Sequence, residues 1–177
     1  MELWKVLLIS FFVISTFGTL LHFTHGWFKK GILLHVFSAL NESTWEHMKL
    51  LLAPTILVIV FQYFAFKGVY SNFWNATLAL LFMELIAMPL LFEPLRVIMK
   101  KVPLWLTIVI FFLSIAIGLL VEYRILTKGI LLFGEFVATV FVVIIGLLFA
   151  IFSYFPPKAF IFKDPVSGKY GDYAHKD

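Results

Sequence analysis

The chain has 177 residues, of which 62% are apolar and only 14% are charged, and its mean hydropathy is +1.01. Soluble domains carry roughly 25% charged residues, so this composition excludes an ordinary water-soluble fold. The absence of cysteine excludes disulfides, thiolate metal sites and cysteine nucleophiles. The net charge of +4 comes from single basic residues beside apolar runs rather than from a basic stripe. We therefore expect the lipid bilayer, and not nucleic acid, to be a partner of the chain.

Five segments have the length and hydropathy of membrane-spanning helices, each of which needs about 20 residues. The first holds no Lys, Arg, Asp or Glu between Lys5 and Lys29. The second starts at Ser43-Thr44-Trp45-Glu46, which has the capping-box pattern of a helix start. The third should end at Glu93, because the proline that follows disfavours the α conformation there. The predicted spans are about 4–28, 44–66, 72–93, 103–123 and 129–155.

Two further segments stand outside these spans. Residues 31–40 are apolar but too short to cross a membrane, so a re-entrant or interfacial helix is expected there. Two prolines stop the last span, and residues 156–177 follow them as a tail. The sequence thus predicts an all-α integral membrane bundle of five helices in a single domain, residues 1–155, with a C-terminal tail.

The distribution of the 14 Lys and Arg residues predicts the orientation of this bundle. With five spans, four of them fall on one side of the membrane and ten on the other. Positive charge is retained on the cytoplasmic side. We expect a multi-pass protein of the cell membrane, with the N-terminus outside and the tail in the cytoplasm.

Small and polar residues recur at helical spacing within the spans and predict their contact faces. Helices in lipid pack through small residues and through polar residues that find partners across the interface. These stripes are Ser15, Gly18, Thr19, His22 and His25; Thr77, Glu84 and Met88; Ser114, Gly118 and Glu122; and Glu135, Thr139, Gly146, Ala150 and Ser153. Ordinary packing explains the hydroxyl and small residues, but not the carboxylates and imidazoles.

Glu84 lies near the middle of the third predicted span. A charged carboxylate at the bilayer centre costs at least ~2.5 kcal/mol. Two interpretations stay open, a neutral glutamate bonded to a neighbouring helix and a proton carrier or ligand. Glu122 and Glu135 are expected closer to the outer surface, where Arg124 and Lys128 can pair with them.

The densest set of polar side chains lies at the predicted inner end of the second span. Asn41, Glu42, Glu46 and His47 are found there, and His22 and His25 end the first span at similar depth. Imidazoles and carboxylates together suit zinc, iron or manganese, but the H-E-x-x-H signature is missing. Three interpretations remain: a capped helix start with interfacial histidines, a transition-metal site of His22, His25, His47 and Glu46, and a metal-free polar site.

Several motifs of the chain resemble those of one protein family. They are Asn41-Glu42-Ser43-Thr44-Trp45-Glu46-His47-Met48-Lys49 followed by Pro54, and Phe155-Pro156-Pro157, Phe162-Lys163-Asp164-Pro165-Val166 and Gly168-Lys169-Tyr170-Gly171. With them the chain resembles, over essentially its whole length, a family of small multi-span bacterial membrane proteins described as a domain of unknown function. The resemblance implies a bacterial inner-membrane protein of five or six spans, and no activity, substrate or cofactor. The family has a histidine where Phe155 stands here, which weakens the case for a ligand from the tail.

Three hypotheses of function, from different classes, are consistent with the sequence. The leading one is a non-enzymatic protein that binds or passes a small solute, ion or proton, with Glu84 deep inside. Its inner vestibule would be formed by His22, His25, Asn41, Glu42, Glu46 and His47. The second is a membrane-embedded metal-dependent hydrolase or transferase acting on lipid or isoprenoid, with Glu46 as general base beside the metal and no organic cofactor. The third is a scaffold or assembly subunit whose polar stripes contact partner helices.

Overall fold

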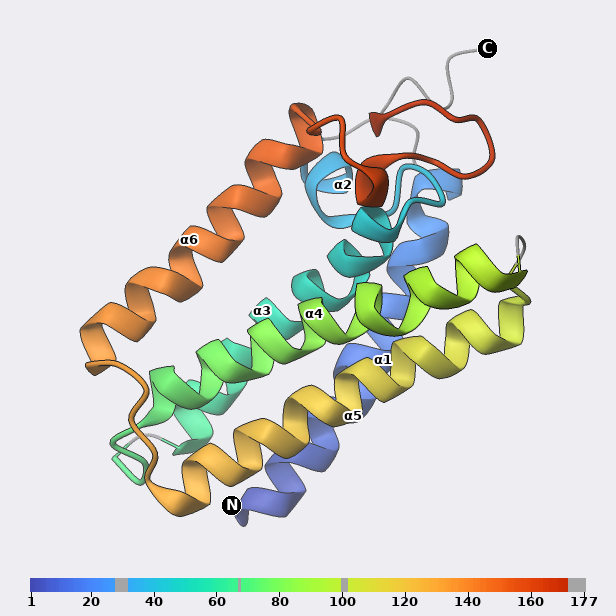
Figure 1. Ribbon diagram of the computed structural model, residues 1–177. Coiled ribbons are helices and arrows are strands. Elements are labelled where there is room, and N and C mark those ends of the chain that lie inside the picture. Colours follow the sequence, from blue (N-terminus) through green and yellow to red (C-terminus); the bar gives the residue numbers. More distant parts are fainter. Residues whose placement is uncertain (28–31, 67, 100–101, 172–177) are drawn as a thin grey trace.

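The computed structural model describes residues 1–27, 32–66, 68–99 and 102–171, except for the side chains of residues 25–27 and 32–34. Its helices are α1 (Leu3–Trp27), α2 (Ile32–Phe37), α3 (Thr44–Phe66), α4 (Phe73–Met99), α5 (Leu104–Lys128) and α6 (Glu135–Tyr154), followed by the 3-10 turn η1 (Phe160–Phe162) (Figure 1). All of these helices except the short α2 are long and apolar enough to cross a membrane. The predicted helical class and the five long apolar helices are confirmed.

Four of the long helices form the centre of the bundle. α4 and α5 lie side by side along their length, and α3 packs against both α1 and α4 (Figure 1). α6 stands to one side and contacts α4, while α2 fills the end of the bundle between α1, α3 and α6 (Figure 1). Several of the fully buried side chains in this centre are polar, and they lie between α1, α3, α4 and α5.

Helix α4 is longer than the sequence predicts. It does not end at Glu93 but continues to Met99, with Pro89 and Pro94 inside the helix. A proline removes one backbone hydrogen bond from a helix, and in membrane proteins neighbouring groups support the turn that is left open. Here Glu93 accepts a hydrogen bond from the Thr44 hydroxyl of α3 and forms an ion pair with Arg96, at 2.8 Å. These contacts hold the turn around Pro94.

Helix α6 begins later than predicted, at Glu135 instead of residue 129. Gly129 ends α5 with φ at 63°, a left-handed conformation that favours glycine at a helix end. Glu135 then caps the start of α4, because its carboxylate accepts hydrogen bonds from the backbone N–H groups of Trp74 and Asn75 at 2.9 and 3.1 Å. This capping replaces the predicted pairing of Glu135 with Lys128.

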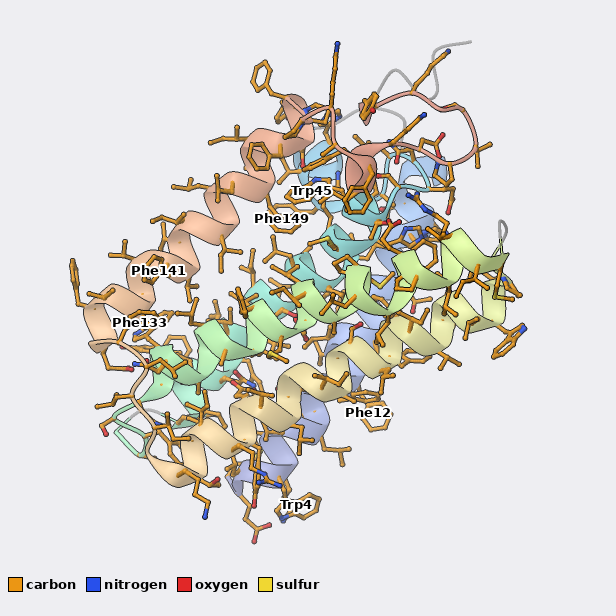
Figure 2. The ribbon with its side chains drawn as sticks, in the orientation of Figure 1. Trp4, Phe12, Trp45, Phe133, Phe141 and Phe149 are labelled. Atoms are coloured by element: carbon orange, nitrogen blue, oxygen red, sulfur yellow. The ribbon has the colours of Figure 1, made fainter. Side chains whose placement is uncertain are left out.

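The tail folds across the end of the bundle at which α3 begins (Figure 1). The ring of Trp45 stacks on Phe149 of α6 and on Phe162 of the tail, with ring centroids 4.1 and 4.5 Å apart. Figure 2 shows Trp45 and Phe149 side by side. The Asn41 side chain donates a hydrogen bond to the Gly171 carbonyl at 3.1 Å. The tail therefore packs on Asn41 and Trp45 of the motif segment.

Asp164 organises the turn within the tail. Its carboxylate accepts hydrogen bonds from the backbone N–H groups of Val166 and Ser167, at 3.2 and 2.9 Å, and from the Ser167 hydroxyl at 2.6 Å. Burial raises the pKa of Asp164, but these bonds and one from the Glu42 backbone outweigh it and hold the pKa below its ordinary value. The stability that the carboxylate adds is therefore present at neutral pH and is lost as the pH falls through that lowered pKa.

Candidate functional site

A buried ion pair lies on the side of α3 that faces α2. Glu46 Oε2 and Lys49 Nζ are 2.7 Å apart, with the two side chains 4% and 1% exposed. Glu46 Oε2 also accepts a hydrogen bond from the Leu40 N–H at 2.8 Å, and Lys49 donates one to the His35 carbonyl at 3.0 Å. Buried charges are tolerated when they are paired and hydrogen-bonded in this way. The pair fastens α2 and the loop after it to α3, and it engages Glu46 in contacts other than His22 and His47.

His22, Glu42 and His47 form a second set, here called the mouth group. The rings of His22 and His47 have centroids 5.8 Å apart. His47 Nδ1 lies 2.9 Å from the Ser43 carbonyl, which can only accept, so Nδ1 carries the hydrogen. The free Nε2 faces Glu42 Oε2 at 3.6 Å. Since the Glu42 side chain is 55% exposed, the mouth group is open to the surroundings.

The predicted vestibule is thus only partly assembled. Asn41 shapes the loop, because its Oδ1 accepts a hydrogen bond from the Ser43 N–H at 2.8 Å while its amide holds the tail. The side chain of His25 lies outside the described residues. Within the described part of the chain, no three His, Cys, Asp or Glu side chains are grouped so that they can hold a metal ion. The geometry brings together His22, Glu42 and His47, but not Asn41, Glu46 or Glu84.

Glu84 lies deep inside the bundle, on the middle of α4, and is 0% exposed. Its Oε2 accepts a hydrogen bond from the Thr55 hydroxyl of α3 at 2.9 Å. Its Oε1 has no hydrogen-bond partner among the residues that the structure describes. Gly118 of α5 makes room for this side chain, since a Cβ there would lie 2.6 Å from Glu84 Cγ. The interior position that its place in the sequence predicts is confirmed.

Glu122 is also 0% exposed and lies one turn after Gly118 on α5. The side-chain amide of Gln62 donates hydrogen bonds to Glu122 Oε2 and to Ser10 Oγ, both at 3.1 Å. The predicted pairing of Glu122 with Arg124 is not formed, because Glu122 points into the bundle and Arg124 is exposed. The carboxyl group joins α1, α3 and α5 instead.

Neither deep carboxyl group has a basic partner. No ion pair between described residues includes Glu84 or Glu122. Glu84 lies against Gly118, one turn before Glu122 on α5, so ionisation of both carboxyl groups is unfavourable. An isolated ionised carboxylate is very costly in apolar surroundings. Each group is therefore expected to carry a proton or to hold a cation.

The partners of both carboxyl groups lie on one face of α3, together with His47 of the mouth group. At 3.6 residues per turn, His47, Thr55 and Gln62 fall within a sector of about 80°. With a rise of 1.5 Å per residue, Thr55 lies about 12 Å from His47, and Gln62 lies about 10 Å further. We call His47, Thr55 and Gln62, with Glu84 and Glu122, the polar row. It covers about 22 Å of a hydrocarbon layer that is about 30 Å thick.

Sequence reasoning missed several residues of this arrangement: Ser10, Lys49, Thr55 and Gln62. A signal for Gln62 was present, since it is the single glutamine of the chain and stands within the apolar run of α3. Its spacing of seven residues from Thr55 and fifteen from His47 repeats the period of a helix face. No comparable signal marks Ser10, because a lone serine in a span is ordinary packing material.

Comparison with known proteins places the chain in a family without assigning it an activity. Residues 1–172 match the model of a family of unknown function, DUF6512. No curated protein and no solved structure matches the chain. Because the match extends over almost the whole sequence, the protein belongs to this family of unknown function.

Proposed function

We propose that the protein passes protons across the membrane along the polar row, with Glu84 and Glu122 as the groups that take up and release them. One observation carries the proposal. Two fully buried carboxyl groups, on two neighbouring helices, stand without a basic partner among the described residues. Ionisable residues inside membrane spans are costly, and they mark proton and ion pathways.

Each level of the polar row offers a group that can exchange a proton. At the mouth, His47 Nε2 lies beside the exposed Glu42 carboxylate. At the next level, Glu84 is held by the Thr55 hydroxyl, and beyond it Glu122 is held by the Gln62 amide. The levels are further apart than a hydrogen bond, so protons cross between them through intervening water or by movement of a carboxyl side chain.

Gly118 shortens the step between Glu84 and Glu122. Because it has no side chain, Glu84 can lie directly against α5, one turn from Glu122. The distribution of Lys and Arg in the sequence supports an orientation, since ten of the 14, including the buried Lys49, are expected on the side of the mouth group. In this proposal the mouth group faces the cytoplasm of a bacterial cell, and Glu122 lies toward the outside.

The test is proton flux into liposomes that contain the purified full-length chain. A potassium gradient with valinomycin drives the flux, and a pH-sensitive dye inside the vesicles reports it. We expect flux above that of empty liposomes for the wild type, and flux equal to that of empty liposomes for Glu84→Gln, which keeps the shape of the side chain but cannot carry the proton.

Glu2→Gln is the matched control, because Glu2 is an exposed carboxylate of the same length, paired with Lys5 at 3.0 Å. It should leave the flux unchanged. If Glu84→Gln conducts as well as the wild type does, or if the wild type does not exceed empty liposomes, the proposal is wrong.

A further inference from the structure

Where Gln62 and Glu122 meet in the polar row, there are more hydrogen-bond acceptors than donors. The Ser10 hydroxyl donates to the Val6 carbonyl at 2.8 Å, so Ser10 Oγ can only accept from its second neighbour, Gln62. This requirement fixes the side-chain amide of Gln62, with its NH2 group toward Ser10 and Glu122 and with Oε1 left without a donor. Both hydrogens of the amide are then used.

Two oxygens are left over at this level. Gln62 Oε1 and Glu122 Oε1 are buried, and neither finds a hydrogen-bond partner within the described part of the chain. Glu84 Oε1, on the helix next to α5, is a third buried oxygen of this kind. Buried polar atoms are nearly always partnered, so each exception needs an explanation. A proton on Glu122 Oε1 that is donated to Gln62 Oε1, or a cation bound by both oxygens, can satisfy the two atoms.

We propose that Glu122 Oε1 and Gln62 Oε1 bind a small alkali-metal cation of the Na⁺ type, with Glu84 as the nearest further carboxyl group. Hard cations prefer oxygen ligands. Ca²⁺ takes about six to eight oxygens, and Mg²⁺ keeps several of its waters. A fully buried site with few free oxygens suits a singly charged ion better, since the dehydration of such an ion costs less.

This inference rests on the proposed function and names a second ion for the same row. The groups that face Glu122 from the packed helices are Ser10 of α1, Gln62 of α3 and Glu84 of α4, and of these only Glu84 can carry a charge. Glu122 therefore needs one positive charge from outside the protein. A proton and a sodium ion compete for it.

The experiment is protection of Glu122 from a hydrophobic carbodiimide, which reacts with protonated carboxyl groups in apolar surroundings. The purified full-length protein is labelled in detergent at one fixed pH, with sodium chloride or with choline chloride at equal ionic strength. Mass spectrometry of the peptide that contains Glu122 gives the labelling rate. We expect sodium to slow labelling several-fold and in a saturable manner, and choline to have no effect.

Gln62→Leu removes one of the two ligands, so its labelling should continue but lose the response to sodium. If this variant does not fold, thermal unfolding of the wild type gives the same test. Sodium should raise the unfolding temperature of the wild type and not that of Glu122→Gln. Equal labelling of the wild type in sodium and in choline overturns the inference.

The two proposals fail separately in these experiments. Loss of proton flux in Glu84→Gln without any sodium protection of Glu122 leaves the proposed function standing and removes the cation site. Sodium protection of Glu122 in a protein that conducts no protons keeps the cation site and removes the proton pathway.

Discussion

Lys49→Met is expected to destabilise the protein by about 3–5 kcal/mol, because it leaves the buried Glu46 carboxylate without its partner. Methionine fills much of the volume of the lysine stem, so the loss comes from the charge and not from a cavity. Only the Leu40 N–H then remains on Glu46 Oε2. Thermal or denaturant unfolding in detergent, followed by loss of helical signal, measures the change.

Lys5→Met is a control with the same chemistry and spacing. Lys5 pairs with Glu2 three residues away, as Lys49 does with Glu46, but at the surface, with side chains 50% and 63% exposed. Such an exposed pair contributes about 0–1 kcal/mol. The double variant Glu46→Leu with Lys49→Met should recover much of the loss, because no unpaired charge is then buried. Equal effects of Lys5→Met and Lys49→Met would contradict this account of the ion pair.

Gly118→Ala is expected to abolish proton flux and to lower stability by about 1–3 kcal/mol, the usual cost of overpacking. The added Cβ would lie 2.6 Å from Glu84 Cγ and 3.1 Å from the Leu80 carbonyl, so either the carboxyl side chain or the two helices must move. Flux in liposomes and unfolding in detergent are measured on the same preparation.

Gly146→Ala is the matched control for this substitution. Gly146 also lies in a long helix, but a Cβ there meets nothing within 4 Å. Alanine is the better helix former, so the variant should be as stable as the wild type or more stable by up to about 1 kcal/mol, with unchanged flux. Glu84→Asp in the Gly118→Ala background removes one methylene beside the added methyl, and part of the flux should return. Flux in Gly118→Ala equal to that in Gly146→Ala would show that the position of Glu84 against α5 does not matter.

Much of the helical architecture follows from hydropathy alone. α3 begins where the capping pattern at Ser43 predicts, and the Glu46 N–H does donate to Ser43 Oγ, at 3.4 Å. The Glu46 side chain, however, does not form the second hydrogen bond of a capping box, because it binds Lys49 and the Leu40 N–H instead. The end of α4 could not be predicted, since one of the contacts that support the helix around Pro94 comes from Thr44 of another helix.

The candidate site shows the same division between local rules and tertiary contacts. The cost of a charge in hydrocarbon predicts that Glu84 faces inward, and it does. The sequence suggested a pair between Glu122 and Arg124 because they are close in the chain, although two residues along a helix point to opposite sides. Likewise Glu46 and His47 are adjacent in the chain and cannot face the same partner, whereas Glu46 and Lys49, three residues apart, can.

In the proposed proton pathway, Glu84 and Glu122 gain and lose protons from the two sides of the membrane. Infrared difference spectroscopy of the protein in liposomes, after a pH change on one side only, tests it directly through the carbonyl band of protonated carboxyl groups. The wild type should show a change in this band. The change should be smaller in Glu84→Gln and in Glu122→Gln, and it should be absent when both residues are replaced. A wild-type difference spectrum identical to that of the double variant would contradict it.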